Sequence, residues 1–121
     1  MLNVAGAYHS RLMQGAYEKL GAALLEVQMQ TPQFPVISNV TGREVKTLPA
    51  IRQTLQDQVT STVRWVDCME RLVNLGCDLF IELGPGGVLA GLLKRTRKDV
   101  DVVSVSDVES VRACAERLGK V

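Results

Sequence analysis

Apolar residues along the chain recur at two alternating spacings, one typical of helices and one typical of strands. Between Arg11 and Gln30 they recur every three or four residues, which predicts an amphipathic helix with Ser10 as its N-cap. Short β-branched and apolar runs separate the helical segments and predict buried strands. The expected helices cover residues 11–30, 48–59, 63–75, 88–95 and 107–118. The expected strands cover residues 2–7, 34–39, 79–81 and 100–105.

Capping and turn residues support these boundaries. Thr47 and Asp107 stand where N-caps are expected, and Gly76 follows the third helix in a typical stop position. Gly15 and Gly21 lie inside the first helix, where each costs about 1 kcal/mol relative to Ala, so we expect close packing there. Strands that alternate with helices of this length predict an α/β fold with mostly parallel strand pairing.

Charge and composition exclude several classes of protein. The 121 residues include 14 Lys and Arg against 13 Asp and Glu, a net charge of +1, which argues against the basic face that nucleic-acid binding requires. No apolar run is long enough to span a bilayer, so no membrane association is expected. The first ten residues lack the charged and apolar regions of a secretory signal.

Cysteine usage predicts a reducing, cytoplasmic location. Cys68, Cys77 and Cys114 are odd in number and widely spaced, with no CxxC pair and a single histidine in the chain. The same scarcity of ligands argues against a metal site.

The glycine-rich segment at residues 84–87 follows an expected strand and precedes an expected helix, a context in which phosphate groups bind. The dinucleotide-binding fingerprint requires glycine at position 89, which is Leu89, and the nucleotide P-loop requires lysine at position 92, which is Leu92. We therefore interpret the segment chiefly as a tight turn, with the wall of an active site as the main alternative.

The single histidine, His9, follows the first expected strand. Ligands of α/β folds collect at the carboxyl ends of strands, and an imidazole there can act as general base to a hydroxyl nucleophile. A lone histidine is also often structural or merely exposed, so spacing alone leaves these alternatives open.

Four stretches together resemble the malonyl-CoA:acyl-carrier-protein transacylases of bacterial fatty-acid synthesis. They are residues 6–13 (GAYHSRLM), 35–42 (PVISNVTG), 63–65 (VRW) and 81–89 (IELGPGGVL), in the order that the family has them. The resemblance implies an α/β fold: the C-terminal part of a hydrolase-like, parallel-sheet acyltransferase core, mostly helical with short strands.

The family's nucleophile is a serine in a G-x-S-x-G elbow that precedes the histidine, and no serine here has glycine two residues before and two after it. We therefore expect residues 1–121 to be the C-terminal portion of a single acyltransferase domain. The nucleophile-bearing part and almost all of the ferredoxin-like subdomain would be absent, and the chain alone would be inactive.

The resemblance also implies a reaction and its residues. A malonyl group passes from malonyl-CoA to the serine and then to the phosphopantetheine thiol of acyl carrier protein, without a cofactor. His9 would be the general base, the main-chain carbonyl of Arg64 would orient its ring, and Tyr8 would influence selectivity for malonyl over bulkier groups.

Two alternatives stay open: a fragment of an acyltransferase domain from a polyketide or fatty-acid synthase, and a non-enzymatic α/β module. The sequence does not predict an oligomeric state.

Overall fold

A computed structural model of the chain describes residues 6–119 and divides the molecule into two units. The first unit is Met1–Leu72 and the second is Val73–Val121. Each unit contains helices and one pair of short strands, with more helix than strand. The chain is thus mixed α/β, as the sequence predicts.

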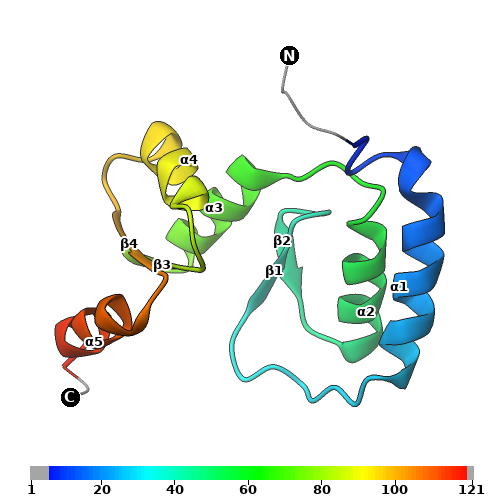
Figure 1. The fold of residues 1–121 in the computed structure, drawn as a ribbon, viewed down its shortest axis with the longest axis horizontal. Helices are drawn as coiled ribbons and strands as arrows, with labels where there is room; N and C mark the ends of the chain where they lie inside the picture. Colours follow the sequence, from blue (N-terminus) through cyan, green and yellow to red (C-terminus); the bar gives the residue numbers. More distant parts are fainter. Residues whose placement is uncertain (1–5, 120–121) are drawn as a thin grey trace. The chain divides into compact units, whose positions relative to one another are not determined.

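Two helices lie side by side in the first unit (Figure 1). The 3₁₀ turn η1 (Arg11–Met13) leads into α1 (Gln14–Glu26), and α2 (Leu48–Asp57) packs against α1. The helices approach closely at Gly21, where an added Cβ would lie 2.0 Å from Nε2 of Gln56. The expectation of close packing is therefore confirmed for Gly21. It is wrong for Gly15, which has no such neighbour within 4 Å among residues 6–119.

A β-hairpin completes the N-terminal part of this unit. Strands β1 (Val36–Ser38) and β2 (Arg43–Val45) are antiparallel, with Ile37 opposite Glu44. Gly42 closes the turn with a φ of +66°, and an added Cβ would lie 2.4 Å from Cβ of Asp67. Glycine is required there both by the positive φ and by the close approach.

Helix α3 (Trp65–Asn74) begins against this hairpin. The N–H of Arg64 donates to the carbonyl of Asn39 at 2.8 Å, immediately before the helix. Further along α3, Arg71 forms a 2.5 Å ion pair with Glu44 of β2. This guanidinium, with Lys46 adding to it, lowers the pKa of the Glu44 carboxyl. Cys68 and Met69 supply buried side chains of the helix.

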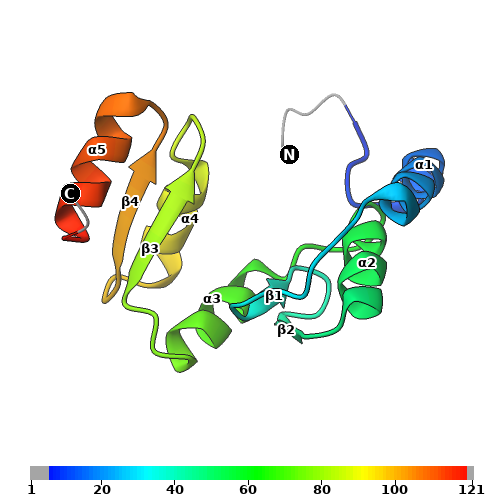
Figure 2. The ribbon, with the colours of Figure 1, turned by 90° about the horizontal axis from the view of Figure 1, so that it is seen from below.

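The second unit is built on a parallel strand pair (Figure 2). Strands β3 (Leu79–Leu83) and β4 (Asp101–Val105) run in register from Leu79 opposite Asp101 to Leu83 opposite Val105. Helix α4 (Val88–Thr96) connects the two strands, and α5 (Val108–Arg117) follows β4. Both helices contact β4, and Leu93 of α4 and Cys114 of α5 are buried. A strand, a crossover helix and a parallel strand form a βαβ unit.

Glu82 of β3 caps the N-terminus of α4. Its carboxylate accepts hydrogen bonds from the N–H of Leu89 at 2.9 Å and of Ala90 at 3.2 Å. The hydroxyl of Ser104 on β4 donates to the same carboxylate at 3.0 Å. These bonds, the one from Leu89 first, lower the pKa of Glu82 below its ordinary value of 4.5. A single side chain thus links β3, α4 and β4.

Several element boundaries match the predictions. Ser10 accepts from the N–H of Leu12, Thr47 caps α2, and Asp107 forms a reciprocal capping box with Ser110 at α5. The first long helix is shorter than predicted, because α1 ends at Glu26 rather than Gln30. The Arg52 side chain of α2 donates to the carbonyl of Val27 at 2.7 Å, just beyond this end.

The expected strand pairing needs correction. Residues 43–45 form a strand that the sequence analysis did not predict, since two of the three carry charge. Their pairing with β1 is antiparallel, because a connection of four residues is too short for a parallel crossover. Parallel pairing therefore holds for one of the two strand pairs in the described residues. Of the first expected strand, residues 2–5 lie outside the described residues, and Gly6 and Ala7 are not in a strand.

Large apolar side chains remain exposed in both units. Phe34, Leu12 and Leu25 in the first unit and Leu83 in the second are 77–80% exposed. Few side chains are buried in either unit. Within residues 6–119, no helix combines the length and apolar character needed to cross a membrane.

The cap made by Glu82 predicts a pH-dependent stability. Because the folded-state pKa is lowered, the carboxylate stabilises the fold above its unfolded pKa, and this stabilisation is lost as pH falls through the folded pKa. Glu82→Gln is therefore expected to lower the thermal unfolding midpoint by several degrees at pH 7, with a smaller difference at pH 3. Circular dichroism melts would measure it. Glu116→Gln, at an exposed position of α5, is the matched control. Equal melting of the two variants at pH 7 would contradict the cap.

Candidate functional site

His9 lies in a short turn whose backbone is held by its neighbours. The hydroxyl of Ser10 donates to the carbonyl of Ala7 at 2.6 Å and accepts from the N–H of Leu12 at 3.3 Å. The carbonyl of Ser10 accepts from the N–H of Met13 at 2.9 Å. These bonds fix the turn on the C-terminal side of His9 and begin η1 directly after it.

The backbone of His9 adopts a conformation that L-residues rarely take. Its φ is +57°, and among residues 6–119 it is the one residue other than glycine with a positive φ. The left-handed region costs a residue with a Cβ roughly 1–2 kcal/mol. Such outliers persist where surrounding contacts determine them, and they cluster at functional sites.

The contact that accompanies this conformation is a hydrogen bond to the end of α2. Nδ1 of His9 lies 2.9 Å from the carbonyl oxygen of Gln58, which is the C-cap residue of that helix. The imidazole itself is exposed. Within the described residues no hydrogen bond is formed by Nε2, which is therefore the ring nitrogen available for proton transfer. A carbonyl oxygen only accepts, so this contact is a hydrogen bond when Nδ1 carries the hydrogen.

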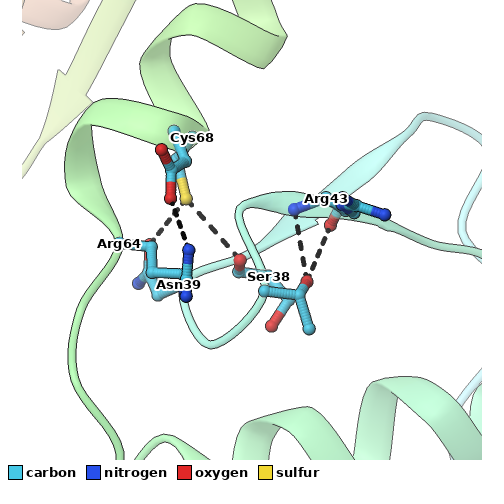
Figure 3. A network of polar contacts seen from close by, with 7 residues as sticks. Ser38, Asn39, Arg43, Arg64 and Cys68 are labelled. Atoms are coloured by element: carbon cyan, nitrogen blue, oxygen red, sulfur yellow. Dashed lines mark hydrogen bonds and ion pairs between the residues drawn. The ribbon is translucent and has the colours of Figure 1, made fainter.

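The carbonyl that the sequence analysis expects to orient His9 is that of Arg64. The Arg64 carbonyl accepts from the N–H of Cys68 at 3.1 Å, in the first turn of α3 (Figure 3). Its guanidinium pairs with Asp67 at 2.9 Å on the helix surface. In the described part of the chain, the carbonyl in contact with the imidazole is that of Gln58. The orienting role of the Arg64 carbonyl stays a prediction.

Sequence reasoning missed Gln58. It is 49 positions from His9, and no motif connects the two residues. The one available signal was its place near the end of the predicted helix 48–59, because the last carbonyls of a helix require donors from elsewhere.

Tyr8 lies next to His9 and is 63% exposed. A Cβ added at Gly6 would lie 3.1 Å from its ring, so the ring folds back toward the preceding backbone.

The Cys68 thiol lies beside the motif at residues 35–42 and could in principle act as a nucleophile. Its surroundings keep it unreactive. Its thiol lies 3.6 Å from the carbonyl of Ser38 and 3.5 Å from Oδ1 of Asn39, between α3 and the hairpin (Figure 3). Burial, with the Asp67 carboxylate second, raises the pKa of the Cys68 thiol. A buried neutral thiol is a poor nucleophile, so Cys68 is not a substitute for a catalytic serine.

The glycine-rich segment at residues 84–87 behaves as the tight turn that the sequence favoured. Gly84, Gly86 and Gly87 have φ values of +125°, +111° and +64°, which explains the concentration of glycine. The N-terminus of α4 that a phosphate would occupy already holds the carboxylate of Glu82. Within the described residues, no group of three or more His, Cys, Asp or Glu side chains could hold a metal ion.

Comparisons with known proteins agree on one family. The malonyl CoA-acyl carrier protein transacylase of Bacillus subtilis (strain 168) is 36% identical over 117 residues, which are 97% of this chain and 37% of that protein. The polyketide biosynthesis malonyl CoA-acyl carrier protein transacylase PksC of the same organism is 41% identical over 102 residues, or 84% and 35%. No protein-family model matches the sequence.

The solved structures that resemble this chain are also malonyl transacylases. The acyl-carrier-protein S-malonyltransferase of Bartonella henselae superposes with a TM-score of 0.88 at 36% identity, covering 98% of this chain and 38% of that one. A malonyl-transacylase in complex with a type II polyketide synthase acyl-carrier protein (PlMCAT with AntF) gives a TM-score of 0.85 at 34% identity, covering 96% and 38%.

The chain therefore has the α/β fold of a segment of an acyltransferase. The acyltransferases that it matches are the malonyl-CoA:acyl-carrier-protein transacylases, which confirms the resemblance seen in the four sequence stretches. It spans about 37% of the length of the relatives that it matches.

The positive φ of His9 predicts an unusual order of stability among its variants. His9→Gly is expected to be about 1 kcal/mol more stable than His9→Ala, because glycine adopts φ of +57° without a Cβ penalty. Urea unfolding of the two variants measures the difference, and both lack the imidazole, so the lost hydrogen bond cancels. At Gln14, an exposed residue of α1 with φ of −54°, the same pair serves as the control and should favour Ala. An alanine variant at His9 as stable as the glycine variant would contradict the strained conformation.

Proposed function

We propose that this chain supplies the histidine-bearing segment of a malonyl-CoA:acyl-carrier-protein transacylase, with His9 as the general base. The observation that carries the proposal is the state of the His9 ring. It is exposed, its Nδ1 is bound to a carbonyl at 2.9 Å, and its backbone is held in a costly conformation. Those features describe an imidazole held in place with Nε2 facing outward, in a chain homologous to transacylases.

In the proposed reaction, Nε2 of His9 accepts the proton of a serine hydroxyl as that oxygen attacks the malonyl thioester. The imidazolium then returns the proton to the departing thiol of CoA. In the second half-reaction the neutral ring takes the proton of the phosphopantetheine thiol of acyl carrier protein, whose sulfur attacks the malonyl-serine ester. The imidazolium finally protonates the serine. The two half-reactions balance with no cofactor.

The serine belongs, in this proposal, to the rest of the transacylase. The relatives are more than twice as long as this chain, and no serine of the chain lies in a G-x-S-x-G elbow. Residues 1–121 would be the C-terminal portion of one acyltransferase domain, as expected from the sequence. The partners would be malonyl-CoA and acyl carrier protein, and the three free cysteines favour a reducing, cytoplasmic location.

Tyr8 is proposed to influence which acyl group is accepted. It directly precedes the general base and is exposed, so its ring can border the acyl group that His9 serves. A smaller residue at this position would admit branched acyl groups more readily.

Polyketide synthesis is a second setting for the same chemistry. The name of one relative assigns it to polyketide biosynthesis, and one structural neighbour is bound to a type II polyketide carrier protein. Comparing malonyl transfer to carrier proteins of the two kinds would distinguish the settings.

A chimera tests the proposed function. This chain replaces the matching segment of the Bacillus subtilis transacylase, and transfer of labelled malonyl groups to carrier protein is measured. The chimera is expected to be active, and His9→Ala is expected to lower kcat by roughly 10²–10⁴-fold with little change in malonyl-CoA binding, because the imidazole transfers protons and does not hold the ground-state substrate.

Arg64→Gln in the same chimera is the matched control, because its main-chain bonds survive and the side chain makes only a surface ion pair. Near wild-type turnover is expected for it. An active chimera that tolerates His9→Ala, or that is more damaged by Arg64→Gln, would assign His9 a structural role. The 121-residue chain alone should acquire no label from malonyl-CoA.

A further inference from the structure

We infer that Arg11 is a specificity-determining residue, which binds a phosphate group of the phosphopantetheine arm of the substrates. The inference rests on the proposed function, in which CoA and the carrier protein both present their thiols to His9 on such an arm. Arg11 follows His9 by two positions and is the first residue of η1, which leads into α1. Its charge and its lack of partners at that place carry the inference.

Arg11 stands where a helix favours the opposite charge. Because η1 runs directly into α1, the N–H groups at the start of this continuous segment carry partial positive charge. Acidic side chains stabilise such an end, and cations destabilise it. The first turns of η1 and α1 contain no acidic residue, and Arg11 adds a full positive charge. The rules of helix stability therefore do not explain why an arginine is present.

The guanidinium of Arg11 also has no partner that would offset this cost. It is exposed, and in the described part of the chain it forms neither an ion pair nor a hydrogen bond. The nearest carboxylate along the helical segment, Glu18, accepts from Gln14 at 3.2 Å. On α2, which packs against α1, Asp57 accepts from Tyr17 at 3.3 Å. A residue that breaks a local rule without compensation in the fold indicates a functional use.

The substrates offer two kinds of anion to an arginine near His9: the malonyl carboxylate and the phosphates. Arginine binds either of them through paired N–H donors. The carboxylate lies close to the reacting thioester, where water must be excluded, whereas Arg11 is exposed. The phosphate lies at the far end of the phosphopantetheine arm, which is about as long as four extended residues, roughly 14 Å. An exposed guanidinium therefore suits the phosphate.

The reach of the side chain is sufficient for this contact. The Cα atoms of His9 and Arg11 are at most about 7 Å apart, because two residues separate by no more than that even in an extended chain. The long, flexible side chain of Arg11 adds a similar length. A thiol held at Nε2 of His9 and a phosphate held by Arg11 are thus compatible with a single extended arm.

The stability of the 121-residue chain tests the cost of Arg11 without any substrate. Arg11→Glu is expected to raise the thermal unfolding midpoint by roughly 2–5 °C, because it replaces an unfavourable charge at the helix start with a favourable one. Lys19→Glu makes the same charge change at an exposed position of α1 beyond its first turn, so it should move the midpoint much less. A midpoint that Arg11→Glu lowers or leaves unaltered would show that the fold bears no such cost, and would overturn the inference.

The active chimera tests the ligand. Arg11→Gln is expected to raise KM for malonyl-CoA about three- to tenfold with kcat nearly constant, because the lost contact is remote from the reacting atoms. Malonyl-N-acetylcysteamine carries the same thioester without a phosphate, so its KM should change little. Lys19→Gln is the matched control and should leave both KM values unaltered. Added salt should reduce the difference between wild type and Arg11→Gln, since exposed charges are screened.

The acceptor thiol distinguishes the sources of the phosphate. An increased KM for both malonyl-CoA and the holo carrier protein would support a contact to the arm that they share, and an increase for malonyl-CoA alone would assign the phosphate to CoA. An equal increase for the two malonyl thioesters would assign Arg11 to the malonyl carboxylate, and an increase for the carrier protein alone would assign it to the surface of that protein. Either result overturns the inference.

A chimera without transfer activity would refute the proposed function and still decide on Arg11. Calorimetric titration of that chimera with CoA should then show an affinity that Arg11→Gln lowers about three- to tenfold. An affinity for CoA that is equal in the two proteins would overturn the inference.

Discussion

The carbonyl oxygens at the C-terminal end of α2 require hydrogen-bond donors, and this requirement governs the geometry of the candidate site. Most of them are satisfied locally by the next N–H groups of the chain. The carbonyl of Gln58 is satisfied by the imidazole of His9, from a turn 49 residues earlier. The backbone of His9 has a φ of +57° where it makes this contact, and the Ser10 bonds hold the turn in that shape. This contact at the helix end engages Nδ1 of His9 and leaves Nε2 without a hydrogen bond among the described residues.

The other unit solves the complementary problem with a carboxylate. The N-terminus of α4 leaves N–H groups without intrahelical partners, and Glu82 accepts two of them from the neighbouring strand. This cap disfavours phosphate binding at α4, because the Glu82 carboxylate already occupies the position that would attract a phosphate. The two helix ends therefore differ in function for a simple reason. The carboxylate of Glu82 is fully engaged in hydrogen bonds at the start of α4. At the end of α2, only Nδ1 of His9 is engaged, and Nε2 makes no hydrogen bond among the described residues.

Local chemistry made much of this fold predictable from the sequence. The caps at Thr47 and Asp107 and the glycine turn at residues 84–87 depend on neighbours a few residues away, and they lie where the pattern predicted. Strand β2 was missed because its charged residues do not give the apolar pattern of a strand. Its Glu44 is stabilised by Arg71, 27 residues later in the chain. In the candidate site too, local features were predicted and contacts between distant residues were not. His9 was found from its motif, whereas its partner Gln58 was not, because contacts between distant segments carry no periodic signal.

The exposed apolar side chains bear on how much of a functioning enzyme this chain can be. Leu12 follows the His9 turn within three residues and is 77% exposed, while Leu83 ends β3 at 80% exposed. Single exposed apolar residues are ordinary, but here they adjoin the candidate base and the end of the parallel pair. General-base catalysis of acyl transfer works best where water is excluded, because solvent competes for the acyl group and weakens every electrostatic contact. A site with an exposed imidazole and uncovered apolar neighbours lacks that protection. In the proposed function, the rest of a transacylase would supply the serine, and covering Leu12 beside the His9 turn would exclude water from the imidazole.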